Sequence, residues 1–154
     1  MSIELTPAGT YGVHMRKLPG LFWNLFSMAV RLRGGRVLNL TTTGAKTGRQ
    51  HTIPLSFYPS GDPAGQPDEN GPWLIVASNG GARRHTAWYI NMARNPEKIW
   101  ITIGKRKWQV QAESLKGAQR DETFRRIAAL FPNYTAYQTK TDRVIPVVRL
   151  TAAP

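Results

Sequence analysis

Two β-branched runs joined by a glycine-bracketed turn, between residues 36 and 58, constrain the fold of this chain more than any other feature. The first run ends in three consecutive threonines at 41–43, and the second begins at Thr52. Gly44 and Gly48 stand between the runs and permit the positive φ angles that a tight turn requires. The pattern predicts strands at 37–42 and 52–58, and therefore a β-hairpin in an antiparallel sheet.

The turn of this hairpin combines hydroxyl groups with positive charge. Backbone N–H groups in such a turn can converge on an anion, while Lys46, Arg49 and His51 supply charge around it. An ordinary hairpin turn with a solvated lysine fits the same residues, so both interpretations stay open. The segment is not a P-loop, because that motif places lysine directly after its second glycine, whereas Lys46 precedes Gly48.

Turn signals divide the rest of the chain into further strands and helices. We expect strands at 73–77, 98–103, 107–115 and 144–150, and helices at about 21–33, at 86–94 and from Asp121 to Phe131, where Pro132 ends the last one. Roughly six antiparallel strands with helices outside predict a mainly β, α+β protein built on a small barrel. We predict a flexible arm over 1–18 and a single domain over 19–154.

The charge of the chain indicates its class of partner. A formal charge of +12 at pH 7 predicts an anionic one: nucleic acid, an acidic membrane face or a polyanionic small molecule. Since 41% of the residues are hydrophobic and 19% are charged, the chain is a folded domain with a basic surface. The lack of cysteine excludes disulfides and thiolate zinc sites, and fits a cytoplasmic protein. The three histidines stand far apart in sequence, so we expect no metal.

The helix expected at 21–33 is apolar around most of its circumference. Its polar residues Asn24, Ser27 and Arg31 fall on one stripe. The apolar stretch is shorter than the ~20 residues that a membrane-spanning helix requires. Packing against the domain is the plain interpretation, and a lid over an apolar substrate or a peripheral membrane contact are the alternatives.

Four segments follow one another along residues 36–150: LTTTGAKTG at 40–48, ASNGGA at 77–82, AWYIN at 87–91 with NP at 95–96, and YTAYQ at 134–138 with TDRVIPVV at 141–148. In order and spacing they resemble the deazaflavin-dependent nitroreductase family, a branch of the flavin and deazaflavin split-barrel oxidoreductases. The resemblance implies a split β-barrel of the FMN-binding-like type. It also implies coenzyme F-420, an 8-hydroxy-5-deazaflavin with a phosphodiester and an oligoglutamate tail, and this anionic cofactor would match the basic chain.

The resemblance further implies which residues bind the cofactor. The glycine turn would hold the phosphate, while the corner after the strand at 73–77 and the helix that follows would lie along the deazaflavin. The residues so implied are Lys46, Thr47, Gly48, Arg49, His51, Pro54, Ala77, Ser78, Asn79, Gly80, Gly81, Trp88 and Asn91. Trp88 is equally compatible with a plain core aromatic. Ala45 and His51 stand where many relatives carry basic residues, so the phosphate would depend more on Lys46 and Arg49.

On the acceptor side, the resemblance implies Ser78, Tyr134 and Tyr137 as catalytic residues. A reduced deazaflavin donates hydride to an electron-poor acceptor, and a hydroxyl that hydrogen-bonds the developing oxyanion stabilises the transition state. Tyrosines in such a segment also often only pack, so this alternative stays open for Tyr134 and Tyr137. Phe131 stands where some relatives place a further tyrosine, which weakens the case for nitro compounds.

We therefore expect an F-420-dependent reductase of a small-molecule acceptor: a conjugated enone, a quinone or a nitro compound. The same fold using FMN is the nearest alternative. A basic nucleic-acid-binding barrel, with Trp100 and Trp108 as stacking aromatics, is the rival from another class. Dispersed basic residues and the lack of an RNP-like or helix-turn-helix pattern argue against nucleic acid as a partner.

Overall fold

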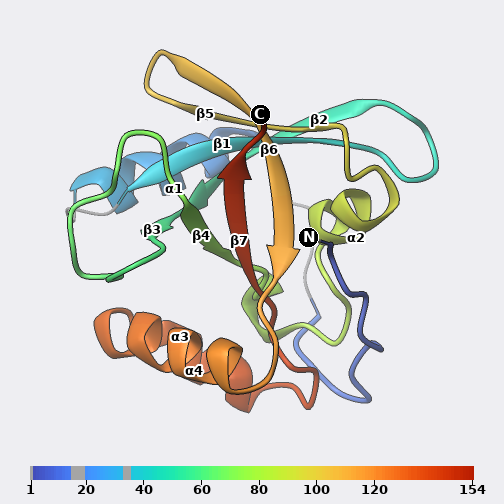
Figure 1. Cartoon of the computed structure of the whole chain (residues 1–154). Coiled ribbons are helices and arrows are strands. Elements are labelled where there is room, and N and C mark those ends of the chain that lie inside the picture. Colours follow the sequence, from blue (N-terminus) through green and yellow to red (C-terminus); the bar gives the residue numbers. More distant parts are fainter. Residues whose placement is uncertain (1, 15–19, 33–35) are drawn as a thin grey trace.

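The computed structural model describes residues 2–14, 20–32 and 36–154, which are organised around one antiparallel sheet (Figure 1). Its strands are β1 Val37–Thr43, β2 Gln50–Ser56, β3 Tyr58–Pro59, β4 Trp73–Val76, β5 Ile99–Ile103, β6 Arg106–Ser114 and β7 Val147–Ala152. The order across the sheet is β2-β1-β5-β6-β7-β4-β3. The sheet curls into a half-barrel, which confirms the predicted split β-barrel. The run predicted at 52–58 is divided between β2 and the two-residue strand β3.

The sequence pattern of the hairpin decides which side chains enter the core. In β1, Leu38 and Leu40 are fully buried while Asn39 between them is exposed, because successive side chains of a strand point to opposite faces. β1 pairs with β2 so that Thr42 lies opposite His51. Buried side chains from the strands and from α2 form the first of two cores.

The helices are α1 Gly20–Leu32, α2 Ala87–Arg94, α3 Gly117–Leu130 and α4 Asn133–Thr139, and η1 Asn79–Gly81 is a short 3-10 turn. α3 begins one turn before the predicted Asp121, and α4 is not among the predicted helices. Pro132 does end α3, but it also stands at the N-cap of α4, where its missing N–H and fixed φ do no harm. α3 and α4 bury Ile127 and Tyr134 in the second core, with side chains of β4 and β7.

α1 packs along β1 and β2 and leaves large apolar side chains in contact with solvent. Leu21, Leu25 and Met28 are 69%, 51% and 52% exposed. None of the described helices is long and apolar enough to cross a membrane.

Residues 2–14 of the arm predicted to be flexible are hydrogen-bonded to the domain. The Asp142 carboxylate accepts from Thr10 N at 2.7 Å and from Thr10 Oγ1 at 2.6 Å. Val13 N donates to Gly81 O at 3.0 Å. Hydrogen bonds therefore hold the described part of the arm against the surface of the domain. Residue 1 and residues 15–18 of the predicted arm lie outside the described residues.

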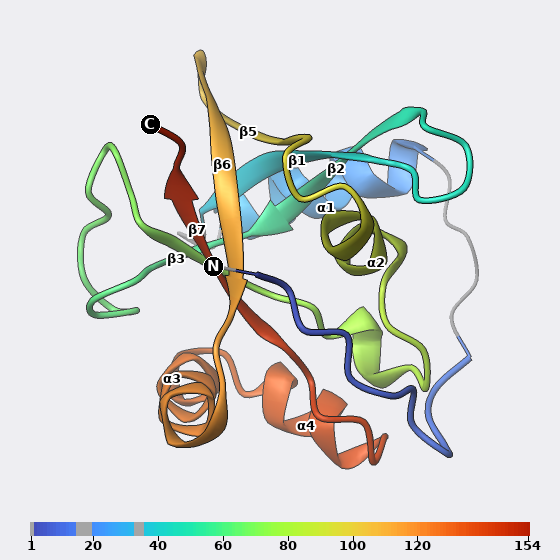
Figure 2. The ribbon, with the colours of Figure 1, turned by 45° about the vertical axis from the view of Figure 1, so that its right-hand side comes forward.

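The segments predicted to form the site succeed one another along one side of the molecule. In Figures 1 and 2 the turn of the β1–β2 hairpin, α2, η1 and α4 follow in that order from the upper right downwards. α2 contacts β1, and α4 contacts η1. The fold therefore brings the strand that leads into the turn against α2, and the corner against α4.

Candidate functional site

Two asparagines hold the glycine turn against α2. Asn91 accepts through Oδ1 from Ala45 N at 3.0 Å and donates from Nδ2 to Thr42 Oγ1 at 3.3 Å. Asn95 donates from Nδ2 to Thr43 O at 3.1 Å. Residues four apart lie on one face of a helix, so both amides reach the same turn. Asn91 is buried and its amide is engaged by the protein, so it positions the turn in this structure.

The backbone of the turn is closed by its own hydrogen bonds. Gly44 N donates to Arg49 O at 2.7 Å, and Gly48 N donates to Gly44 O at 3.0 Å. A Cβ atom on Gly44 would lie 2.6 Å from Thr47 Oγ1, so a larger residue would displace that hydroxyl. Thr47 Oγ1 accepts from Arg49 N at 3.2 Å and retains its own proton to donate.

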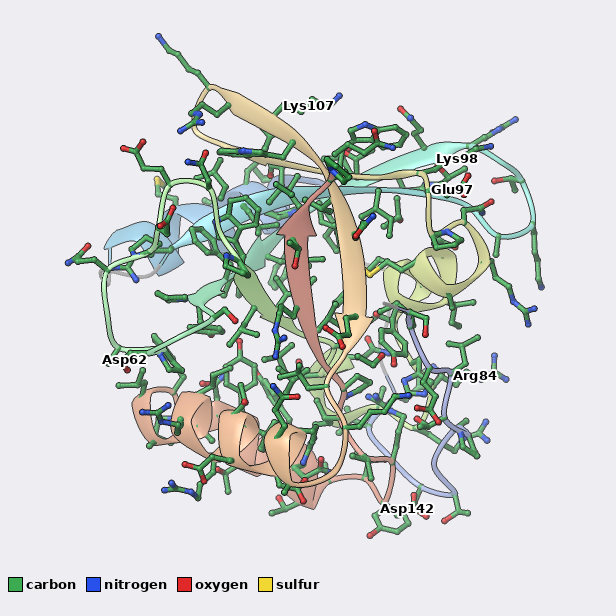
Figure 3. All side chains as sticks on the ribbon, in the orientation of Figure 1. Asp62, Arg84, Glu97, Lys98, Lys107 and Asp142 are labelled. Carbon is green, nitrogen blue, oxygen red and sulfur yellow. The ribbon has the colours of Figure 1, made fainter. Side chains whose placement is uncertain are left out.

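Positive charge surrounds this closed turn. Lys46, Arg49 and His51 are exposed, and none of the ion pairs among the described residues includes them. Lys98 lies beside the hairpin (Figure 3), and its carbonyl oxygen accepts from Thr43 Oγ1 at 3.4 Å. The turn is therefore held by its own hydrogen bonds and by α2, and it presents Lys46 and Arg49 to solvent with no ion-pair partner among the described residues.

The corner after β4 has an uncommon backbone conformation. Ser78 has the right-handed helical backbone conformation. The next three residues, Asn79, Gly80 and Gly81, have positive φ angles of 46°, 60° and 83°. A Cβ atom on Gly81 would lie 2.5 Å from Tyr137 O in α4, so only glycine allows this packing. Ser78 is half-buried, and its hydroxyl does not cap η1 and takes part in none of the hydrogen bonds among the described residues.

Arg143 lies beneath the corner and binds its backbone. The side chain is only 2% exposed. The guanidinium donates to Ser78 O at 2.9 Å, to Ala82 O at 3.1 Å and to Ala77 O at 3.3 Å. It also donates to His85 Nδ1 at 3.1 Å. Desolvation lowers the pKa of Arg143, and no carboxylate of the described residues forms an ion pair with it.

His85 connects Arg143 to the N-terminal arm. Arginine can only donate, so His85 Nδ1 must accept, and Nε2–H donates to Thr6 O at 2.9 Å. Burial lowers the pKa of His85, the bond to Thr6 raises it in part, and the charge of Arg143 lowers it again. His85 is therefore neutral at pH 7, and it joins the arm to the corner.

Tyr134 is buried in the second core, where its hydroxyl oxygen lies 2.6 Å from that of Tyr58. Burial raises the pKa of Tyr134 to about 12. Burial also raises the pKa of Tyr58, with a further increase from the neighbouring Tyr134. These contacts agree with the packing alternative, since Tyr134 presents no exposed hydroxyl to an acceptor.

The other predicted residues divide by exposure. Tyr137 is half-buried on the α4 segment that contacts η1. Pro54 is half-buried on the edge strand β2, opposite Asn39. Trp88 and Ala77 are packed in the first core, and the 6% exposure of Trp88 matches its interpretation as a core aromatic.

Arg143, Asn95 and Tyr58 are not among the residues predicted from the sequence to form the site. Arg143 stands in the resembling segment at 141–148, but its role had no signal there, because its carbonyl partners are 61 to 66 residues away in sequence. Asn95 did have a signal, since it stands four residues after Asn91. Two amides on one helix face are a pattern that can pin a loop.

The tryptophans of the nucleic-acid hypothesis face opposite sides of the sheet. Trp108 pairs with the buried Ile101 and packs 5.1 Å from Trp73, measured between ring centres. Trp100 pairs with Gln109 and points to the other face. The structure therefore offers no single stacking surface that contains both tryptophans.

The described structure has two hollows, and only the second borders the glycine turn, through Asn95 and Lys98. One, of about 240 Å³, lies between residues 62–64 and α3, and the other, of about 170 Å³, is lined by residues 94–98. The described residues contain no group of three metal-ligating side chains that could hold an ion.

The range that contains these segments matches a known protein family. The family model described as F420H(2)-dependent quinone reductase matches residues 24–152, which include the turn, the corner, α2 and α4. An F420H(2)-dependent quinone reductase of Mycobacterium tuberculosis (strain H37Rv) is 36% identical over 119 residues, which are 74% of this chain and 72% of that protein.

Solved structures agree with this match. A structure described as an F420-H2 dependent reductase, FDR-A, has a TM-score of 0.59 at 34% identity and covers 75% of this chain and 93% of that one. A second, described as a domain-swapped dimer, has a TM-score of 0.60 at 30% identity and covers 86% of this chain and 99% of that one.

Proposed function

The chain belongs to the F420H(2)-dependent quinone reductase family and is therefore an F-420-dependent reductase, and we propose that it transfers hydride from reduced F-420 to a quinone. A quinone is the acceptor that the names of the family and of its mycobacterial relative specify. Conjugated enones share the electron-poor carbonyl of a quinone and are proposed as further acceptors. Nitro compounds are a weaker proposal, because Phe131 replaces a tyrosine of some relatives.

The observation that carries this proposal is the hydrogen-bonded, cationic glycine turn. Its exposed Lys46 and Arg49 have no carboxylate partner among the described residues, and Thr47 keeps a hydroxyl proton to donate. A phosphodiester supplies the charged acceptor oxygens that these groups can bind, and charge-assisted hydrogen bonds are about twice as strong as neutral ones. We assign these residues to the phosphodiester, and Lys98 beside them to attraction of the oligoglutamate tail.

The corner and α4 are assigned to the ring and the acceptor. When bound, reduced F-420 supplies hydride from ring carbon C5. The protein has to place the acceptor and to stabilise the negative charge that develops on the quinone oxygen before a proton completes the hydroquinone. Ser78 offers an unengaged hydroxyl for that hydrogen bond, and Tyr137 is the second candidate because its helix segment contacts the corner.

Equilibrium titration of the protein with F-420, FMN and a short oligonucleotide tests the cofactor assignment. We expect a dissociation constant for F-420 in the micromolar range or below, and markedly weaker binding of FMN. Mixing the complex of the protein and reduced F-420 with a water-soluble quinone should then yield oxidised F-420 and hydroquinone in equal amounts. Equal or tighter binding of FMN, or no reaction with the quinone, would contradict the proposal.

Lys46 provides the test of the turn. Lys46→Ala should raise the dissociation constant of F-420 by roughly one to two powers of ten, because a charge-assisted contact is lost. Turnover at saturating cofactor should stay close to that of the wild type. Lys107→Ala is the control, because Lys107 is an exposed lysine of the β5–β6 hairpin (Figure 3). Loss of turnover with unchanged cofactor affinity would show that Lys46 has another role.

A further inference from the structure

We propose that Arg143 is the positioning residue of the cofactor corner. Its buried guanidinium fixes the backbone of residues 77–82 in the conformation that receives the deazaflavin ring. This inference rests on the proposed function, because it takes the corner as the place where the ring binds.

The acceptors of Arg143 are concentrated on the corner. Three of the four acceptors of the guanidinium are the carbonyl oxygens of Ala77, Ser78 and Ala82, at 3.3, 2.9 and 3.1 Å. The peptide bonds after Ala77 and Ser78 are trans, so their N–H groups point away from the guanidinium when their carbonyl groups point toward it. One side chain therefore sets the orientation of two consecutive peptide groups at the start of the corner.

Two further hydrogen bonds tie the corner to its surroundings: Val13 N donates to Gly81 O at 3.0 Å, and Asn79 Nδ2 donates to Arg84 O at 3.0 Å. The corner's own backbone bonds are Gly81 N to Ser78 O and Ala82 N to Asn79 O, both at 3.0 Å. Three consecutive residues have positive φ, and Asn79 adopts it without being a glycine. Such a conformation persists when several contacts of the surrounding structure hold it in place. The hydrogen bonds from the Arg143 guanidinium to the corner carbonyls are among these contacts.

Arg143 also places a positive charge directly behind the corner. The adjacent carboxylate, Asp142, is exposed and accepts from Thr10 and Tyr11 of the arm instead. The charged or titratable groups that act on the Arg143 guanidinium are then His85, which is neutral, and the Tyr89 hydroxyl. A buried cation without a carboxylate is costly, and an electron-rich ring on the corner would lower that cost.

Arg120 offers a matched comparison within the same chain. Its side chain is 12% exposed, and its guanidinium also binds a backbone carbonyl, Ile145 O, at 2.7 and 3.0 Å. A further bond reaches Gln138 Oε1 at 3.1 Å. Arg120 lies on α3, and its hydrogen bonds go to none of the corner residues. If Arg143 only stabilised the fold, replacement by lysine should have the same kind of effect at both positions.

The test uses two ligands, F-420 and its deazaflavin riboside, which has the ring but lacks the phosphodiester and the tail. Both are titrated by fluorescence into the wild type, Arg143→Lys and Arg120→Lys, and thermal unfolding monitors the fold. Arg143→Lys should weaken both ligands by the same factor, roughly ten- to a hundredfold, because lysine keeps the charge but cannot span four acceptors. Arg120→Lys should bind both ligands as the wild type does, while Lys46→Ala should weaken F-420 far more than the riboside.

The outcomes separate this inference from the proposed function. Wild-type affinity for the riboside in a folded Arg143→Lys variant would overturn the role of Arg143 and leave the F-420 site intact. A wild type that binds neither ligand would overturn the proposed function and this inference with it. If Arg143→Lys does not fold, NMR of the wild type decides: saturation with the riboside should shift the Nε–H signal of Arg143 but not that of Arg120. An unchanged Arg143 signal would overturn the proposal.

Discussion

At the scale of single residues, burial separates the hydroxyls assigned to the acceptor. Ser78 is half-buried and unengaged, whereas Tyr134 is 8% exposed and bonded to Tyr58. We expect Tyr134→Phe to lower the free energy of unfolding by about 1 kcal/mol, because the buried Tyr58 hydroxyl loses a partner. In the same variant, the rate of quinone reduction in a single turnover should stay within about twofold of the wild-type rate. Ser78→Ala should lower this rate by more than Tyr134→Phe does. Denaturant unfolding and stopped-flow absorbance measure the two effects.

Cofactor affinity is the control for the two variants Tyr134→Phe and Ser78→Ala. Tyr134→Phe and Ser78→Ala should both bind F-420 with wild-type affinity, which confirms that the cofactor site is intact. A tenfold or larger loss of rate in a stable Tyr134→Phe variant, with cofactor binding unchanged, would show that the Tyr134 hydroxyl takes part in reduction of the acceptor.

His85 makes stability depend on pH. Its pKa in the folded protein is lowered from the ordinary 6.5, so the unfolded chain binds the proton more readily. The stabilisation is complete above pH 6.5 and is lost as the pH falls through the lowered folded pKa. Protonation also removes the Nδ1 acceptor that faces Arg143. We expect the free energy of unfolding to fall between pH 7 and pH 5, as measured by urea unfolding at each pH.

His85→Gln isolates this contribution, because the amide can accept and donate but does not titrate in this range. Its stability should change less between pH 7 and pH 5 than that of the wild type. Asp142 does not interfere, since its hydrogen bonds with Thr10 lower its pKa below an ordinary value that is already far below pH 5. If the free energy of unfolding changed equally with pH in the two proteins, His85 would be excluded as the source of the pH dependence.

At the scale of elements, α1 presents an apolar face that the sheet does not cover. Leu21, Leu25 and Met28 are exposed, and the chain is strongly basic. We propose a peripheral contact with an anionic membrane surface, since apolar insertion and charge attraction add. The protein should cosediment with vesicles that contain phosphatidylserine more than with vesicles of phosphatidylcholine alone. Leu25→Asp should reduce that binding. Leu130→Asp on α3, where the leucine is 43% exposed, is the matched control. Equal binding by both variants would locate any contact elsewhere.

At the scale of the whole molecule, the net charge of +12 should make cofactor affinity depend on salt. Exposed charges are screened over about 10 Å at 0.1 M ionic strength, so the dissociation constant of F-420 should rise from low to high salt. The deazaflavin riboside lacks the phosphodiester and the tail, and its affinity should change much less. Titrations of both ligands at 20 mM and 500 mM sodium chloride measure the difference. A dissociation constant of F-420 that ignores salt would show that the surface charge plays no part in binding.

The sequence by itself determined the parts of this protein that depend on local chemistry. β-branched runs around Gly44 and Gly48 specify a hairpin, because strand preference and turn geometry act between near neighbours. The same local patterns located the helices at 20–32 and 87–94 to within a residue or two. The turn with Lys46, the corner and their family resemblance likewise indicate F-420 from the sequence.

The tertiary structure decided what depends on partners far apart in the chain. Tyr134 became a core residue because it packs in the second core, where its hydroxyl shares a hydrogen bond with that of Tyr58, 76 residues away. Asn91 became a support of the turn because α2 packs on β1. Arg143 stands in a segment that the family resemblance marked, but its partners are carbonyl groups that every residue carries, so the sequence did not indicate its place under the corner. Burial and long-range hydrogen bonds arise only when the sheet curls, which is why the sequence identified the kind of site and the fold decided which residues build it.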